Sequence, residues 1–469
     1  MVFLFVYFNV IITINMSSFK VKGGYELSGE ITPQGAKNEA LQIVASSILT
    51  GQIVINNIPK ISDVLSVINM LSDGGAIVKW DSKIDGEKES DFIKNKVFID
   101  TRNLQKDYFK SDKYFVDSQK TRGALLFMGP LLARYGIAYI PATGGDKIGA
   151  RPIDTHTLGL INLGAKLNFG NDHNSLSISD VISDKDILLD DASVTGTANI
   201  IMCAMRGVSN LTVYNAASET YISQLVRVLE KCGASIIGGG TNRLSITSEK
   251  LFDSEGDFVK DVGVIEHTVL ADFIEVASFI ALAMGTRSEI IIKGADIKNL
   301  GQSLSMFTKL GAKYEIEGDN IKVLKQEKYQ IQKMYDGSMM KIYSSPWPMV
   351  SPDILSVGIV AAMQCDGVVL FHEKMYEARM FFVDKLIAMG ASIVLCDPHR
   401  VVVTGNDWKS KMRPRHMTSP DIRAGISMLI AALGADGESI IDNVDQIDRG
   451  YQNIEQRLTK LGAHIERVN

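Results

Sequence analysis

The chain has 469 residues, of which 46% are hydrophobic and 22% charged, and its formal net charge is −5. This length exceeds the span of a single hydrophobic core and predicts two domains of an ordinary globular protein. The negative charge argues against nucleic acid as a partner, because nucleic-acid binders normally carry a basic face.

Residues 1–15 are apolar and uncharged. They are too few to span a bilayer comfortably, and they lack the basic start and the cleavage site of a signal peptide. We interpret them as an extension ahead of a natural start at Met16 that is not part of the fold. A membrane anchor is the less favoured alternative, so no stable membrane insertion is expected.

The cysteines show neither CxxC nor metal-ligand spacing, which is typical of reduced structural cysteines in a cytoplasmic protein. The four are Cys203, Cys232, Cys365 and Cys396. The sequence also contains no GxGxxG motif and no P-loop. We therefore expect neither a metal nor an organic cofactor.

Along the chain a Gly-Ala pair repeatedly ends an amphipathic helix and begins a strand, since glycine is a common C-terminal stop. Successive pairs are 69 to 89 residues apart, and another glycine followed by a β-branched run precedes each pair by 23 to 28 residues. The pairs are Gly75-Ala76, Gly164-Ala165, Gly233-Ala234, Gly311-Ala312, Gly390-Ala391 and Gly462-Ala463.

Before these glycines lies a second helix, rich in Ala, Gly and Ser, that must be buried on most sides. Each unit therefore consists of a helix, a strand, a helix and one or two strands, repeated six times. The predicted fold class is α/β, with two lobes of three units that have helices inside and sheets outside, an inside-out α/β barrel. Inner helices are expected at Asn38–Thr50, Arg122–Tyr135, Asp272–Met284, Asp353–Gln364 and Asp421–Ala435.

Residues 142–159 form a glycine-rich stretch that carries an acid, Asp146, and a base, Lys147. Its glycines predict a mobile loop, and Arg151-Pro152 predicts the start of a helix. An acid on such a loop could transfer a proton next to a bound anion. An ordinary polar loop is the alternative.

Polar residues concentrate where the inner helices begin, and most can be explained as helix caps. They are Lys37-Asn38, Thr121-Arg122, Asp191 to Thr197, Asp272, Ser351-Pro352-Asp353, and Ser419-Pro420-Asp421 with Arg423. Capping does not explain the cations, which are unfavourable at helix N-termini unless an anion neutralises them. The sequence therefore predicts an anionic ligand between the lobes. Arg379 and Arg449 would add donors, or they would form surface ion pairs.

In combination these motifs resemble the enolpyruvyl transferases, and within them the UDP-N-acetylglucosamine 1-carboxyvinyltransferase family. The match begins near Phe19 and reaches the C-terminus. The resemblance implies two lobes with two chain crossings, here residues 37–245, with a mobile catalytic loop at 142–155, and residues 16–36 plus 246–469. The motifs are Gly35-Ala-Lys-Asn38, Gly144 to His156, Ser193-Val194, Pro352-Asp353, Asp421-Ile-Arg423 and Ile447-Asp-Arg-Gly-Tyr451.

The resemblance also implies the substrates, phosphoenolpyruvate and UDP-N-acetylglucosamine, and the role of each matching residue. Asp146 is the expected general acid and Asp353 the general base, with Lys37, Asp421, Arg423 and Arg449 as further catalytic residues. Substrate binding is expected at Lys37, Asn38, Arg122, Arg151, Pro152, Ile153, Asp154, Thr155, Asp191, Ala192, Ser193, Val194, Asp353, Met375 and Arg379.

One departure from the family is chemically important, because most members carry cysteine where this chain has Asp146. Fosfomycin alkylates that cysteine, and a carboxylate is a far poorer nucleophile, so we expect insensitivity to this antibiotic. A second departure is Ser-Val-Thr-Gly-Thr at 193–197, which leaves the role of Thr195 open.

Two alternatives to this function have different sequence signatures. The sister enzyme 5-enolpyruvylshikimate-3-phosphate synthase fits poorly, because this chain offers only Gln34-Gly-Ala-Lys-Asn-Glu near its start. An inactive paralogue that binds UDP-sugars and regulates the pathway is disfavoured by the joint presence of the proposed catalytic residues. Peptidoglycan precursor synthesis, with its part in cell shape and division, is the expected process.

Overall fold

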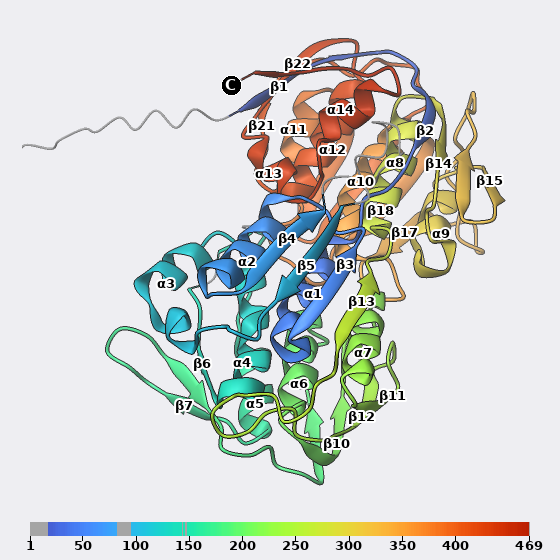
Figure 1. Ribbon diagram of the computed structural model, residues 1–469. Helices are drawn as coiled ribbons and strands as arrows, with labels where there is room; N and C mark the ends of the chain where they lie inside the picture. The colour runs from blue at the N-terminus through green and yellow to red at the C-terminus, as the bar shows by residue number, and fades with distance from the viewer. Residues whose placement is uncertain (1–16, 82–94, 143, 146–147, 469) are drawn as a thin grey trace, which may run out of the picture.

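The computed structural model describes residues 17–81, 95–142, 144–145 and 148–468 (Figure 1). The apolar segment 1–15 and the predicted acid Asp146 lie outside these residues. Among the described residues, no helix is long and apolar enough to cross a membrane. All four cysteines are free thiols, three of them buried and Cys396 exposed.

The elements lie in two groups, which we call the lower half and the upper half from their places in Figure 1. The helices of the lower half are α1 (Lys37–Thr50), α2 (Ser62–Asp73), η1 (Lys106–Lys110), α3 (Asp112–Ser118), η2 (Arg122–Phe127), α4 (Met128–Tyr135), α5 (Asp154–Asn162), α6 (Val194–Ala204) and α7 (Thr220–Lys231). Its strands are β3 (Gln52–Asn56), β4 (Ile77–Asp81), β5 (Lys96–Asp100), β6 (Ile137–Tyr139), β7 (Lys166–Asn168), β8 (Ser175–Ser177), β9 (Lys185–Leu188), β10 (Val208–Tyr214), β11 (Ser235–Ile237), β12 (Arg243–Ser248) and β13 (Val264–Thr268).

The upper half combines the first two strands of the chain with everything after residue 270. Its helices are α8 (Phe273–Gly285), η3 (Ile297–Asn299), α9 (Ser303–Lys309), α10 (Pro352–Met363), α11 (Val383–Ala388), α12 (Ile422–Leu433), α13 (Asp445–Asp448) and α14 (Ile454–Thr459). Its strands are β1 (Ser18–Gly23), β2 (Ser28–Ile31), β14 (Glu289–Ile292), β15 (Tyr314–Glu317), β16 (Asn320–Val323), β17 (Met340–Tyr343), β18 (Asp366–His372), β19 (Ser392–Asp397), β20 (Arg400–Asn406), β21 (His416–Thr418), β22 (Gly437–Asp442) and β23 (His464–Val468).

Five four-stranded sheets share one pairing pattern, in which a parallel pair is followed by two antiparallel neighbours. Their orders are β13-β3-β5-β4, β9-β10-β12-β11, β2-β14-β16-β15, β17-β18-β20-β19 and β21-β22-β1-β23. A three-stranded antiparallel sheet, β6-β8-β7, lies in the lower half. The observed architecture is therefore mixed α/β, as the sequence predicts.

The apolar helices expected from the sequence form the core. Every residue of α8 is buried, and α8, α10 and α12 pack against one another. One expected helix, Arg122–Tyr135, is divided into the 3₁₀ turn η2 and the helix α4. Pro130 explains the division, because proline lacks an N–H and its ring clashes with the carbonyl four residues earlier.

The chain passes between the halves twice, and the two crossing segments are hydrogen-bonded to each other. The Ala36 N–H donates to Leu270 O and the Asp272 N–H donates to Gln34 O, both at 2.8 Å. Because β13 pairs with β3, residues 264–268 lie with the lower half, and the second crossing segment lies near Ala271.

Around these crossings the halves contact each other directly. The contacts are Asp63 with Arg449 at 2.9 Å, Lys60 N with Gln452 Oε1 at 2.7 Å, Ser218 Oγ with Trp347 O at 2.6 Å, and Ala378 N with Ile148 O at 3.1 Å. They surround a cavity whose lining comes from both halves.

Candidate active site

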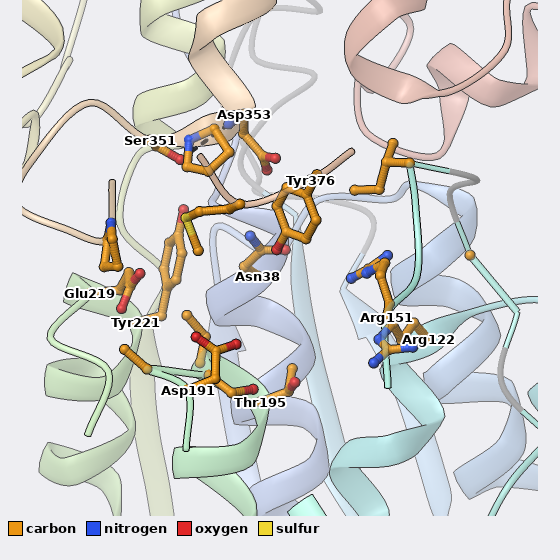
Figure 2. A pocket seen from close by; sticks show the side chains of 18 of the residues that line it. Asn38, Arg122, Arg151, Asp191, Thr195, Glu219, Tyr221, Ser351, Asp353 and Tyr376 are labelled. Carbon is orange, nitrogen blue, oxygen red and sulfur yellow. Dashed lines mark hydrogen bonds between the residues drawn. The ribbon is translucent and has the colours of Figure 1, made fainter. Parts of the chain in front are cut away.

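A cavity of about 530 Å³ contains most of the polar residues that the sequence singled out (Figure 2). Among the described residues, the predicted site residues outside its lining are Ile153 and Asp421. Ile153 precedes α5 and packs against the core, and Asp421 caps α12 by accepting hydrogen bonds from the N–H groups of Arg423 and Ala424. The predicted helix start at Arg151-Pro152 lies three residues early, since α5 begins at Asp154.

Other residues at the helix starts also act as caps. The side chains of Thr121, Ser193, Asp272 and Ser351 each accept a hydrogen bond from a backbone N–H in the first turn of the helix that follows. The capping explanation is therefore confirmed for these residues. The cations beside them need another explanation.

Arg122 and Arg151 form the basic side of the cavity (Figure 2). Burial, reinforced by the charge of Arg151, lowers the pKa of Arg122 to about 10. Among the described residues neither guanidinium forms an ion pair, and Arg122 Nη2 donates only to Pro152 O at 3.2 Å. A bound anion would offset the mutual repulsion of these two charges.

A carboxylate, Asp353, lies at the N-terminus of α10 between two arginines. Its Oδ1 is 2.8 Å from Arg379 Nη2, and its Oδ2 is 3.2 Å from Arg423 Nη2. Burial alone would raise the pKa of Asp353, but Arg423, Arg379 and Lys37 outweigh burial and hold it below its usual range. Asp353 is therefore ionised at neutral pH and can accept a proton.

The sequence did not single out Asp63, which holds two of the predicted cations. Its Oδ2 is 3.2 Å from Lys37 Nζ, and its Oδ1 is 2.9 Å from Arg449 Nε. The side chains of Asp63 and Lys37 are only 6% and 10% exposed. Its position in the sequence could have indicated Asp63, because it lies in the first turn of a helix, as Asp353 does.

A buried hydrogen-bond chain supports the start of α6. The Gly129 N–H donates to Asn199 Oδ1 at 2.7 Å, which leaves the Asn199 amide nitrogen to donate to His156 Nδ1 at 3.0 Å. Burial, with the charges of Arg122 and Arg151, lowers the pKa of His156 to about 3. Neutral His156 therefore carries its proton on Nε2 and donates it to Thr195 Oγ1, 3.0 Å away.

Two more residues of the lining were missed because nothing local distinguishes them. Tyr221 and Gln42 are 3% and 1% exposed, and among the described residues the Tyr221 hydroxyl and both polar atoms of the Gln42 amide have no hydrogen-bond partner. In the sequence each is one of several polar residues in its helix. Only the fold places them at a cavity.

Comparison with known proteins identifies the class to which this fold and site belong. Residues 21–458 match the family model described as EPSP synthase (3-phosphoshikimate 1-carboxyvinyltransferase), and the chain belongs to this family. Among solved structures, the enolpyruvyl transferase NikO from Streptomyces tendae has a TM-score of 0.79 at 17% identity, covering 97% of this chain and 99% of that one. An EPSP synthase from Acinetobacter baumannii has a TM-score of 0.64 at 16% identity, covering 97% and 100%.

Curated relatives are similar at a much higher level of identity. Proteins from Bacteroides thetaiotaomicron and Bacteroides fragilis are 47% identical, covering 97% of this chain and 100% of theirs. A Porphyromonas gingivalis protein is 46% identical with the same coverage. Each of these relatives is named UDP-N-acetylglucosamine 1-carboxyvinyltransferase.

Proposed function

We propose that this protein transfers the enolpyruvyl group of phosphoenolpyruvate to the 3-hydroxyl of UDP-N-acetylglucosamine and releases phosphate. The names of its curated relatives support this activity. The observation that carries it is the ionised carboxylate of Asp353 beside Arg379 and Arg423 in one cavity. Such a site can accept a proton from a hydroxyl group while cations hold an anionic reactant.

In the proposed reaction the sugar oxygen bonds to C2 of phosphoenolpyruvate while C3 gains a proton. The C3 proton is then lost, the C2–O bond to phosphate breaks, and the alkene reforms. Asp353 takes the hydroxyl proton, and the surrounding cations stabilise the charged intermediate. An anion that draws Arg423 and Arg379 away from Asp353 would raise the pKa of that carboxyl and strengthen it as a base.

Asp146 is the proposed proton donor to C3, on the strength of its sequence position alone. We also propose the cation Lys37 and the Asp421–Arg423 pair as aids to catalysis, with Asp421 acting through its cap on α12. The segments Arg151 to Thr155 and Asp191 to Val194 would hold the uridine diphosphate, and Met375 would contact the nucleotide. Insensitivity to fosfomycin follows if Asp146 replaces the reactive thiol.

On the scale of the fold, we infer two lobes of three units that meet at the crossings near Gly35 and Ala271. The shared sheet pattern supports this division. Of the described residues, it assigns those between 36 and 270 to one lobe, and residues 17–35 and 271–468 to the other. A cytoplasmic location and a part in peptidoglycan synthesis, and through it in cell shape and division, belong to the same proposal.

The test is phosphate release from phosphoenolpyruvate with each of two acceptors. We expect release with UDP-N-acetylglucosamine, none with shikimate 3-phosphate, and no time-dependent inactivation by fosfomycin. Release with shikimate 3-phosphate instead would favour 3-phosphoshikimate 1-carboxyvinyltransferase activity, after which the matching family is described. Binding of the UDP-sugar without release from either acceptor would indicate a regulatory paralogue.

A further inference from the structure

Tyr221 is a buried tyrosine in the lining of the cavity, and its hydroxyl group has no hydrogen-bond partner among the described residues. It lies in the first turn of α7 and its ring stacks on Phe273, with centroids 5.9 Å apart and an interplanar angle of 20°. Leaving a buried hydroxyl unpaired is unfavourable, because the group has lost its bonds to water and gained none in the protein. A hydroxyl in that state at a binding cavity is prepared to bond a ligand.

Three carboxyl groups act on Tyr221, those of Asp272, Asp353 and Glu219, together with one cation, Arg423. Figure 2 shows Arg122 and Arg151 on one side and Glu219 and Tyr221 on the other, with the Tyr221 hydroxyl directed toward the segment of Ser351 and Asp353. Anionic groups of a ligand are favoured beside the arginines. An uncharged part of the same ligand therefore belongs beside Tyr221.

The hydroxyl of Tyr221 can act there only as a neutral group. Burial, with the charges of Asp272 and Asp353, raises the pKa of Tyr221 well above its usual value, so the proton stays on the oxygen. A ligand hydroxyl fits between this O–H donor and a carboxylate, since it accepts one hydrogen bond and donates another. An apolar group of the ligand would leave the Tyr221 hydroxyl without a hydrogen-bond partner.

We propose that Tyr221 is a specificity residue that donates a hydrogen bond to a hydroxyl group on the sugar of the acceptor substrate. This inference rests on the proposed function. It predicts that Tyr221 contributes to binding the sugar and not the nucleotide diphosphate. Because the hydroxyl has no partner among the described residues, we expect its removal to lower affinity without lowering stability.

The experiment compares Tyr221→Phe with Tyr114→Phe by calorimetric titration and urea unfolding. Tyr114 is the matched control, because its hydroxyl is also buried and unpartnered among the described residues but does not line the cavity. We expect Tyr221→Phe to raise the Kd for UDP-N-acetylglucosamine about fivefold to tenfold and to leave the Kd for UDP unchanged. Tyr114→Phe should change neither Kd, and neither variant should be less stable than the unmodified protein.

UDP-sugars that lack one hydroxyl identify the bond. The analogue without the Tyr221 partner should bind Tyr221→Phe and the unmodified protein equally. The inference alone is overturned if Tyr221→Phe binds UDP-N-acetylglucosamine as the unmodified protein does, if it loses affinity for UDP to the same degree, or if it unfolds at clearly lower urea. Failure of the unmodified protein to bind UDP-N-acetylglucosamine would overturn the proposed function as well.

Discussion

At the scale of single residues, the cavity changes the charge that a side chain carries at neutral pH. Burial raises the pKa of Glu219 to about 7, and the nearby charge of Asp191 adds to this shift. Glu219 is therefore mostly neutral at pH 6 and mostly ionised at pH 8. The pKa of Asp353 is lowered by the neighbouring arginines, so Asp353 is ionised at both pH values.

Glu219 should make substrate binding depend on pH. Raising the pH through 7 puts a negative charge into a cavity that we propose binds an anionic nucleotide, so the KM for UDP-N-acetylglucosamine should rise between pH 6 and pH 8. Glu219→Gln should flatten that part of the rise, measured as KM at half-unit pH steps. Glu230→Gln is the control, since Glu230 is an exposed carboxylate on α7, the helix that Glu219 precedes. A rise that persists unchanged in Glu219→Gln would contradict the assignment.

The sequence could identify three cations of the site because each stands in the first turn of a helix, where a cation is unfavourable. They are Lys37, Arg122 and Arg423, and all three line the cavity. Asp63 and Tyr221 could not be found in this way. Their importance depends on contacts with residues far away in the chain, such as the 386-residue separation between Asp63 and Arg449.

At the scale of elements, close packing of the inner helices depends on glycine at particular points. Gly129 in α4 faces the backbone of α6, where an added Cβ would overlap the carbonyl oxygen of Asn199. Gly159 in α5 faces α6 as well, but there the added Cβ would meet the end of the flexible Ile200 side chain. The composition of these helices predicted close approach, while only the structure shows which glycine meets backbone.

Gly129→Ala and Gly159→Ala should therefore differ in stability. Alanine gains about 1 kcal/mol of helix propensity over glycine at either position. Overpacking against backbone costs about 1–3 kcal/mol or more, whereas a side-chain terminus can rotate away. We expect Gly129→Ala to lower the free energy of unfolding in urea and Gly159→Ala to stay within about 1 kcal/mol of the unmodified protein. Equal losses in both would show that the Ile200 side chain cannot rotate away, and no loss in Gly129→Ala would show that α4 and α6 separate easily.

At the scale of the whole molecule, Asp63 joins three parts of the structure. It lies on α2 of the lower half, binds Lys37 at the first crossing, and binds Arg449 of the upper half. Removing one member of a buried ion pair leaves charge without compensation, at a cost of about 3–5 kcal/mol. The ion pair therefore couples the cohesion of the halves to the charge state of the cavity.

Asp63→Asn should lower the melting temperature, and inorganic phosphate should restore part of the loss by supplying negative charge to Lys37 and Arg449. Asp448→Asn is the control, because Asp448 pairs with Arg467 at 2.8 Å wholly within the upper half. We expect phosphate to raise the melting temperature of Asp63→Asn more than that of Asp448→Asn or the unmodified protein. Equal shifts in all three would indicate a general salt effect and remove Asp63 from this role.

The α/β class and the buried helices could be predicted because both follow from periodicity that repeats along the chain. The place of the second crossing could not be predicted from the sequence. Residues 246–268 have the composition of strands and turns, which would suit either half. Pairing of β13 with β3 decides it, and that register is a contact between strands about 210 residues apart.

The pairing of β1 also bears on the order in which the molecule is completed during synthesis. β1 ends at Gly23, yet its two neighbours, β22 and β23, begin at Gly437 and His464. At about 5–20 residues per second, a ribosome needs roughly 20 to 80 seconds to make the intervening chain. The lower half is synthesised well before β22 and β23 are. We therefore expect β1, the first strand of the chain, to lack its sheet neighbours until synthesis is nearly complete.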